Sequence, residues 1–257
     1  MDAAFTIREA VARVADIRIR AMRNPALQAA RTAVKSFQST RFSATYFDLL
    51  SSAEYGAAAQ FFLEDLYSEK DYSHRDAQFS RIAGAIQALF PHQVVTTAVA
   101  LAQLHLLTEE LDLQMASSWL AFSTAENQDA VSQYVACWKS VGRQSDRRRQ
   151  LEMVLNVGSD LDRLTRTTGL RFMLKMMRKP AIAAGLGSLQ SFLESGFDTF
   201  SNMSGNGKAA IEFLDTIRER ESYWIELLSL SGDLEARAAL NACLSNSRTA
   251  GRTTPAE

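Results

Sequence analysis

The chain has 257 residues, with 28 basic side chains against 29 acidic ones. This near-neutral balance argues against a constitutive nucleic-acid-binding protein, because such proteins neutralise phosphates with a basic excess. Two cysteines exclude a disulfide framework, and the low content of glycine (12) and proline (4) indicates few turns and long helices.

Apolar residues recur at helical spacing throughout the first half of the chain. The start of the second predicted helix is marked by Asn24-Pro25, and that of the third by Ser51–Glu54, which resembles a capping box. The fifth predicted helix is apolar on nearly all sides between Val94 and Leu107, so we expect it to be central and buried. The five predicted helices cover residues 5–22, 26–50, 51–67, 73–89 and 91–122.

The second half repeats this pattern, with a strong break at Ser204–Gly207 and a polar tail. We therefore expect an all-α protein, a single-domain bundle of about nine or ten helices over residues 1–244, built around a buried central helix near residues 91–122. Residues 245–257 are expected to be a disordered tail. The predicted helices of this half cover residues 126–141, 145–167, 169–184, 188–203 and 207–230.

The N-terminus lacks the basic and apolar regions of a secretory signal. The longest apolar run, Val94 to Leu107, is shorter than a membrane-spanning helix and contains polar residues such as Gln103 and His105. We therefore expect a cytoplasmic protein without a transmembrane segment.

A polar stripe interrupts the apolar fifth helix. His105, Thr108, Glu109 and Asp112 follow one another at a spacing that places them on one helix face. Ionisable groups entering a core must be paired or metal-bound. The stripe is therefore either a structural polar seam, in which His105 pairs with Glu109 or a neighbouring helix, or a metal or ligand site.

The third predicted helix carries candidate partners for this stripe in Glu64, Asp65 and Tyr67. Helical di-metal sites combine inward Glu residues with Glu-x-x-His spacing, which this sequence does not contain. We therefore favour a structural seam or a polar ligand contact over a metal site. The metal candidates are Glu64, His105, Glu109 and Asp112.

Charge is distributed in blocks along the chain. Residues 48–130 carry 12 acidic and 3 basic side chains, and residues 131–185 carry 11 basic and 4 acidic ones. We expect these blocks to neutralise one another when the helices pack. The alternative is a contact between Arg147, Arg148 and Arg149 and an anionic partner.

The segment Phe172–Lys179 is apolar, rich in methionine and basic. We expect it to be a core helix whose long basic side chains extend to the surface. The alternative is an adaptable contact with a peptide or with a membrane surface.

The run Phe61–Tyr67 resembles the signature of the FFLEELY-motif proteins, a bacterial family named after its motif. Asp65 stands where the motif has its second Glu, which keeps the carboxylate and shortens the side chain. The resemblance covers roughly residues 40–225. It implies an all-helical unit, and it implies no activity, cofactor or catalytic residue. Further similar segments are Asp71, Arg75-Asp76, Phe90-Pro91, Leu104-His105, Glu110–Asp112, Met177–Pro180, Leu189–Phe197 and Ile217–Glu221.

Two functional hypotheses follow. The first is a non-enzymatic binding or regulatory protein with a protein or small-molecule partner. The alternative is a metal-dependent oxidase of the heme-oxygenase-like helical type, with its site at the His and carboxylate cluster. The sequence does not identify a cofactor, and the absence of nucleotide-binding glycine motifs gives no support to a nucleotide site.

Overall fold

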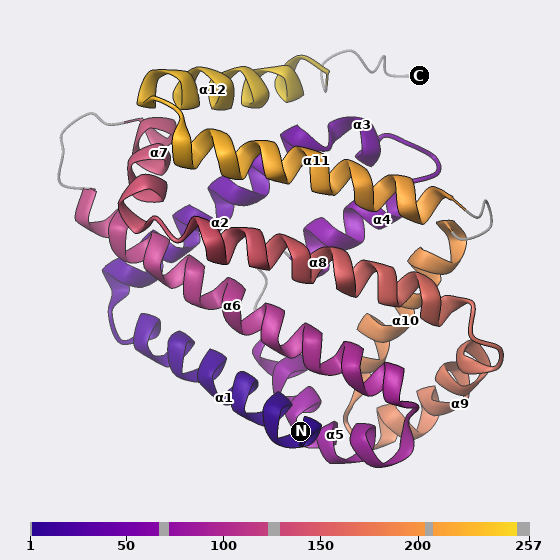
Figure 1. Ribbon diagram of the computed structural model, residues 1–257. Coiled ribbons are helices and arrows are strands. Elements are labelled where there is room, and N and C mark those ends of the chain that lie inside the picture. Colours follow the sequence, from indigo (N-terminus) through magenta and orange to yellow (C-terminus); the bar gives the residue numbers. More distant parts are fainter. Residues whose placement is uncertain (1, 67–71, 123–128, 204–207, 251–257) are drawn as a thin grey trace, which may run out of the picture. The chain divides into compact units, whose positions relative to one another are not determined.

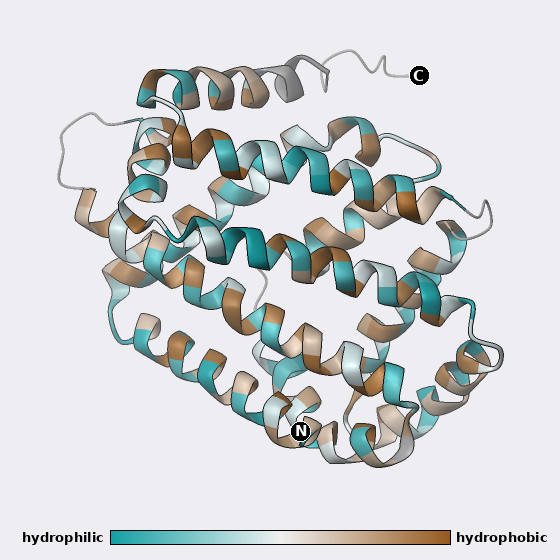
Figure 2. Ribbon diagram, viewed as in Figure 1, coloured by the Kyte–Doolittle hydropathy of each residue, from teal (hydrophilic) through white to brown (hydrophobic). Residues whose placement is uncertain are grey.

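The computed structural model describes residues 2–66, 72–122, 129–203 and 208–250 (Figure 1). Within these ranges the regular structure is entirely helical, which confirms the all-α prediction. Brown and teal residues alternate along most helices, as amphipathic packing requires (Figure 2). The elements are α1 (Ala3–Met22), α2 (Pro25–Thr45), α3 (Phe47–Leu50), α4 (Gly56–Phe61), the π-helical η1 (Phe62–Leu66), α5 (Ser73–Leu89), α6 (His92–Phe122), α7 (Ala130–Val141), α8 (Gln144–Thr165), α9 (Leu170–Ala183), α10 (Gly187–Met203), α11 (Ala209–Leu230) and α12 (Asp233–Ala250).

The chain divides into two compact units. Unit 1 consists of Met1–Ile19, Lys70–Glu110 and Arg149–Arg218, and unit 2 consists of Arg20–Glu69, Leu111–Arg148 and Glu219–Glu257. The single domain over residues 1–244 stays a prediction. Helix α12 continues to Ala250, so residues 245–250 are helical where the sequence predicts the start of a disordered tail. Residues 251–257 lie outside the described ranges.

The core of unit 1 contains many small side chains from α1, α5 and α6. Ile7 and Ala83 are completely buried in it. Alanines let helix backbones approach closely, so three helices share one compact cluster. The buried members are Ala4, Ile7 and Ala10 of α1, Ala83 and Ile86 of α5, and Val95, Ala98 and Ala102 of α6.

The core of unit 2 is aromatic instead. The ring of Phe37 on α2 stacks on Tyr134 of α7, with centroids 4.3 Å apart, and lies 6.4 Å from Trp119 of α6. The indole of Trp138 packs beside Tyr134 and donates a hydrogen bond to Ser229 Oγ on α11 (3.1 Å). Each buried indole or phenol adds a large apolar area with a polar end that needs a partner.

The described part contains twelve α-helices, two more than the ten predicted ranges, because α3 is separate from α2 and because α12 follows the last predicted helix. Two boundaries also differ from the sequence prediction. The predicted helix over residues 26–50 is interrupted at Tyr46, which separates α2 from α3. The predicted capping box does not start the next helix. Ser52 Oγ instead accepts hydrogen bonds from the backbone amides of Glu54 and Tyr55, which fixes a turn, and α4 begins at Gly56.

Helix α9 differs from the prediction in a way that matters for function. The side chains of Phe172, Met176 and Met177 are 68%, 62% and 42% exposed. The interpretation of this segment as a core helix is therefore wrong. Only one side of α9 packs inward, through residues such as Leu174 and Ala181. None of the described helices is long and apolar enough to cross a membrane.

Candidate functional site

His105 is held by an ion pair within unit 1. Its Nε2 lies 3.0 Å from Asp76 Oδ2, and the same oxygen accepts from Arg18 Nη1 at 2.8 Å. These groups come from α6, α5 and α1. His105 thus pairs with a neighbouring helix, as expected for a structural seam.

The electrostatics of this cluster favour an ionised Asp76. Burial by itself would raise the pKa of Asp76, but the hydrogen bond from His105 and the charges of His105 and Arg18 hold it below its usual value. An ionised carboxylate between two donors ties three helices together. The sequence did not indicate Asp76 or Arg18 as candidate site residues, because Asp76 resembles an ordinary acidic residue in a first helical turn.

Of the other residues of the predicted stripe, Glu109 and Asp112 are buried and Thr108 is half-buried. Thr108 Oγ1 accepts a hydrogen bond from Gln150 Nε2 of α8 (2.8 Å). Glu109 is only 2% exposed, and the carboxylate of Asp112 in unit 2 lies 3.8 Å from Lys35 Nζ of α2. Thr108 and Asp112 therefore contact polar partners from other helices, as a seam would.

No group of three or more His, Cys, Asp or Glu side chains is arranged to hold a metal ion among the described residues. A metal-dependent oxidase needs such a group. The described residues therefore give no support to that hypothesis. The carboxylate of Glu64 accepts a hydrogen bond from Gln60 Nε2 (2.6 Å). The side chain of Asp65 and all of Tyr67 lie outside the described part.

The segment Phe61–Leu66 has an unusual backbone. It runs from the end of α4 into the π-helical η1, and Phe61 and Phe62 are 5% and 2% exposed. Single π-helical turns are rare and are frequent at functional sites. Here Phe61 and Phe62 are core residues of unit 2.

The three consecutive arginines do not form one cluster. Arg147 is buried, and its guanidinium lies over the Trp138 ring, 4.6 Å from the centroid. Arg148 is exposed and lies 3.5 Å from Glu226, and Arg149 is exposed. Anion binding at these residues stays a prediction.

Unit 2 contains a buried ion pair that the sequence did not indicate. Arg41 of α2 donates two hydrogen bonds to the carboxylate of Glu221 of α11, both 2.9 Å long, and Tyr46 Oη donates a third (3.0 Å). Burial would lower the pKa of Arg41, but the charge and hydrogen bonds of Glu221 raise it above its usual value. Arg41 and Glu221 are 180 positions apart in the sequence. Helical periodicity describes local spacing only, so it does not reveal that these two residues pair.

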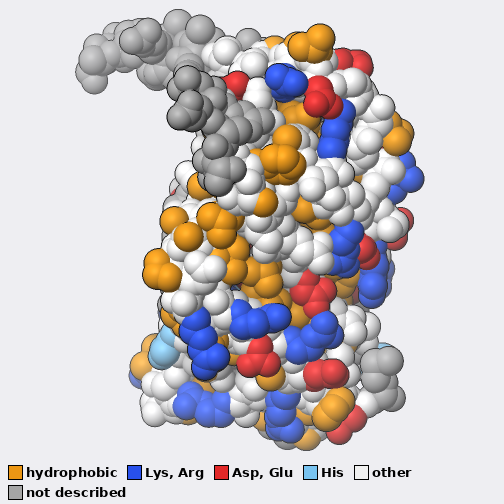
Figure 3. Space-filling model, turned by 90° about the vertical axis from the view of Figure 1, so that its left-hand side faces the viewer, with side chains coloured by type: hydrophobic (Ala, Val, Ile, Leu, Met, Phe, Trp, Pro, Cys, Tyr) orange, Lys and Arg blue, Asp and Glu red, His pale blue; other side chains and the backbone are white. Residues whose placement is uncertain are grey.

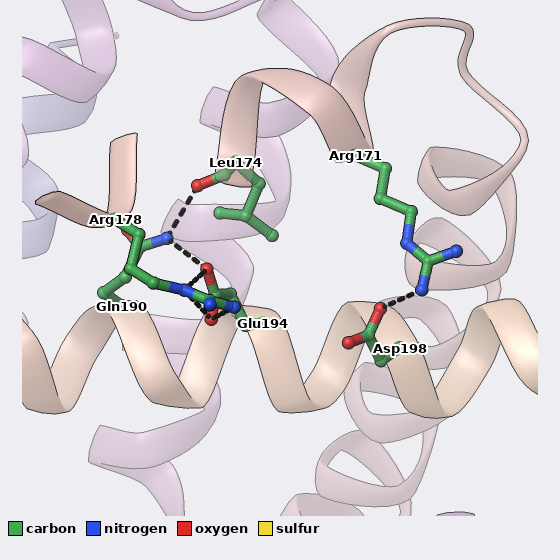
Figure 4. Close-up of polar contacts among 6 residues, drawn as sticks. All are labelled: Arg171, Leu174, Arg178, Gln190, Glu194 and Asp198. Carbon is green, nitrogen blue, oxygen red and sulfur yellow. Dashed lines mark hydrogen bonds and ion pairs between the residues drawn. The ribbon is translucent and has the colours of Figure 1, made fainter. Parts of the chain in front are cut away.

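Helices α9 and α10 of unit 1 are fastened together by a second ion pair (Figure 4). Arg178 Nε donates to both oxygens of Glu194 (2.9 and 3.0 Å), and its Nη2 donates to Oε2 at 2.7 Å. The hydrogen bonds from Arg178 lower the pKa of Glu194, although its burial opposes this. Near the start of α9, Arg171 Nη2 donates a hydrogen bond to Asp198 Oδ1 (2.9 Å).

Gln190 completes the contact between the two helices. Its Nε2 donates to the carbonyl of Leu174 on α9 (2.8 Å) and to Glu194 (3.0 Å), as Figure 4 shows. The polar side of α9 is therefore fixed to α10 along the length of the helix.

Helix α5 contacts α10 through a hydrogen bond and a cation–π interaction. Gln78 Oε1 accepts the backbone N–H of Leu189 in the first turn of α10 (2.9 Å). The guanidinium of Arg75 lies between two aromatic rings, 4.1 Å from the centroid of Tyr72 and 4.3 Å from that of Phe192. Arg81 Nη2 donates to the carbonyls that follow the end of α9.

Because its polar side is occupied, α9 presents a mixed apolar and basic side to solvent. We call the four side chains Phe172, Lys175, Met176 and Lys179 the α9 surface. All four are exposed. The sequence indicated the basic character of this helix, since Leu170–Ala183 contains four basic residues and no acidic one. Periodicity alone does not say which side of such a helix packs inward.

Comparisons with known proteins assign the chain to a family. Residues 18–233 match the model of the family described as "Domain of unknown function (DUF8198)", and the chain belongs to this family. The comparison with curated proteins and the comparison with solved structures each gave no match.

Proposed function

We propose that this member of the family is a non-enzymatic binding protein that contacts its partner through the α9 surface. The observation that carries the proposal is the exposure of Phe172 (68%) and Met176 (62%) on a helix whose opposite side is fixed to its unit. Burying such a side chain is worth about 1.5–3 kcal/mol. These side chains are exposed in the isolated chain, so a partner that covers them would gain this free energy on binding.

Other apolar side chains of α9 and α10 are exposed as well. Met177 is 42% exposed, Ile182 at the end of α9 is 60% exposed, and Leu193 on α10 is 37% exposed. Contiguous apolar patches are uncommon on monomeric proteins and mark interaction sites. Phenylalanine and methionine also suit this role, because methionine adapts its shape to the partner.

The ion pairs between α9 and α10 also favour binding. Arg178–Glu194 and Arg171–Asp198 hold the helix in place before any partner arrives. A contact surface that is already ordered loses less conformational entropy on association.

Site-specific photo-crosslinking in the organism that encodes the protein tests this proposal. A benzoylphenylalanine at position 172 is compared with one at Phe5, which is another exposed phenylalanine of unit 1 (62%). We expect a covalent adduct from position 172 and none from position 5. Equal adducts from both positions, or none from either, would overturn the proposal.

A further inference from the structure

We infer that the partner of the α9 surface is an anionic lipid surface, on which α9 lies at the level of the headgroups. This inference rests on the proposed function and names the class of partner.

The four side chains of the α9 surface form one compact group. Phe172 and Met176 are neighbours at i and i+4, and so are Lys175 and Lys179. Each apolar residue also has a lysine three positions after it. An apolar row therefore lies directly beside a basic row, both exposed to solvent. Interfacial helices insert the apolar row among the acyl chains and keep the basic row at the phosphates.

The two lysines retain their charge for a partner. No carboxylate of the described residues lies within ion-pair distance of Lys175 or Lys179, and α9 itself contains no acidic residue. Lys175 contributes to the low pKa of Glu194 without forming an ion pair with it. By contrast, Asp198 and Glu194 neutralise the two arginines of the helix. The outward side is therefore basic, and its complement is anionic.

The size of the surface favours a lipid over a protein. A stable protein interface covers about 800 Å² on each partner, which a few side chains of one helix do not supply. A bilayer interface needs only a few inserted apolar side chains and nearby basic groups. The long stems of Lys175 and Lys179 let their amino groups reach the phosphates while Phe172 and Met176 insert.

Both ends of α9 are fixed, so the helix does not have to fold on the lipid. Gly169 before the helix and Gly185 after it have positive φ values of 83° and 70°, which glycine adopts without strain. Arg81 binds the carbonyls of Ala184 and Gly185. A cytoplasmic location, which the sequence predicts, would give α9 access to the leaflet that carries anionic lipid.

Co-sedimentation of the full chain with vesicles tests the inference. One set of vesicles contains phosphatidylcholine alone, and the other also contains phosphatidylglycerol. We expect binding to the second set only, and we expect high salt to weaken it. Lys175→Gln with Lys179→Gln should weaken this binding by about fivefold per lysine. Phe172→Ser with Met176→Ser should weaken it at least as much.

Matched controls in unit 1 are Lys208→Gln and Phe5→Ser, which change an exposed lysine and an exposed phenylalanine outside α9. We expect both to bind as the wild type does. Circular dichroism of each variant verifies that it is folded. Failure to bind phosphatidylglycerol, or equal binding by the α9 variants and the controls, would overturn the inference.

The photo-crosslinking experiment separates this failure from a failure of the proposed function. A lipid adduct at position 172 supports both. A protein adduct at position 172 without vesicle binding overturns the lipid surface and leaves the binding function in place. The absence of both an adduct and vesicle binding overturns both.

Discussion

The two units each contain an arginine that donates several hydrogen bonds to a glutamate on another helix, in different surroundings. In unit 2 the side chains of Arg41 and Glu221 are 10% and 16% exposed. In unit 1 the side chains of Arg178 and Glu194 are 54% and 16% exposed. The two glutamates are equally exposed, so the burial of the arginine is what distinguishes the two pairs.

The buried pair is part of a core. Arg41 also lies over the ring of Trp224 (5.8 Å), and Tyr46 donates to the same glutamate. Removing either charge would leave the other one desolvated and unpaired. The exposed pair orients a helix whose other side faces solvent, and water replaces its partners easily. We conclude that the first pair stabilises the fold, whereas the second positions a surface.

The solvent-exposed face in Figure 3 shows acidic and basic side chains next to one another. The neutralisation of one charged block by another stays a prediction. The α9 surface departs from this pattern because its two lysines have no such neighbour within ion-pair distance in the described residues.

The largest expected loss of stability follows from a change at Glu221. Glu221→Ala should lower the free energy of unfolding by about 3–5 kcal/mol, because it leaves the Arg41 guanidinium buried without its carboxylate. Urea denaturation followed by circular dichroism measures the loss. The double variant Arg41→Met with Glu221→Leu should lose much less, since it leaves no buried charge. An equally large loss in both would contradict the assignment of a desolvated pair.

The next largest effect is at the cluster of unit 1. Asp76→Asn should cost about 1–3 kcal/mol, because Arg18 and His105 lose their common charged acceptor. Asp198→Asn is the matched control, since its carboxylate is half exposed and pairs with an exposed arginine. Equal urea midpoints for these two variants would show that the Asp76 cluster is no more important than a surface pair.

The same cluster predicts a pH dependence. The pKa of Asp76 is lower in the folded chain than the value of about 3.9 in an unfolded chain. The stabilisation is therefore present above about pH 4 and is lost as the pH falls through the lower, folded-state value. The difference in unfolding free energy between wild type and Asp76→Asn should shrink on acidification. A difference that is constant from pH 6 to about pH 3 would refute this.

The smallest effect is expected at the exposed pair. Glu194→Gln should lower the free energy of unfolding by roughly a fifth or less of the loss at Glu221, because the Arg178 guanidinium stays hydrated. The same urea titration measures it. A loss as large as that of Glu221→Ala would remove the distinction between the two pairs.

Helix periodicity predicted most of the elements and the burial of α6, since these follow from local spacing. It also placed His105, Thr108, Glu109 and Asp112 on one helix face, and it left open whether that face is a structural seam or a site. It could not predict Asp76 and Arg18 as partners of His105, because such pairing depends on how distant helices pack. The orientation of α9 was missed for a related reason. An amphipathic helix with an apolar row can present that row either to the core or to a partner.

Our central claim is that the apolar row of α9 is exposed in the isolated protein. Methionine oxidation tests it directly, because dilute peroxide converts accessible methionines to sulfoxides. Met176 and Met177 are 62% and 42% exposed, whereas Met115 and Met203 are 0% and 2% exposed. Peptide mass spectrometry after brief oxidation should show rapid modification of Met176 and Met177 and protection of Met115 and Met203. Protection of Met176 to the same degree as Met115 would contradict the account.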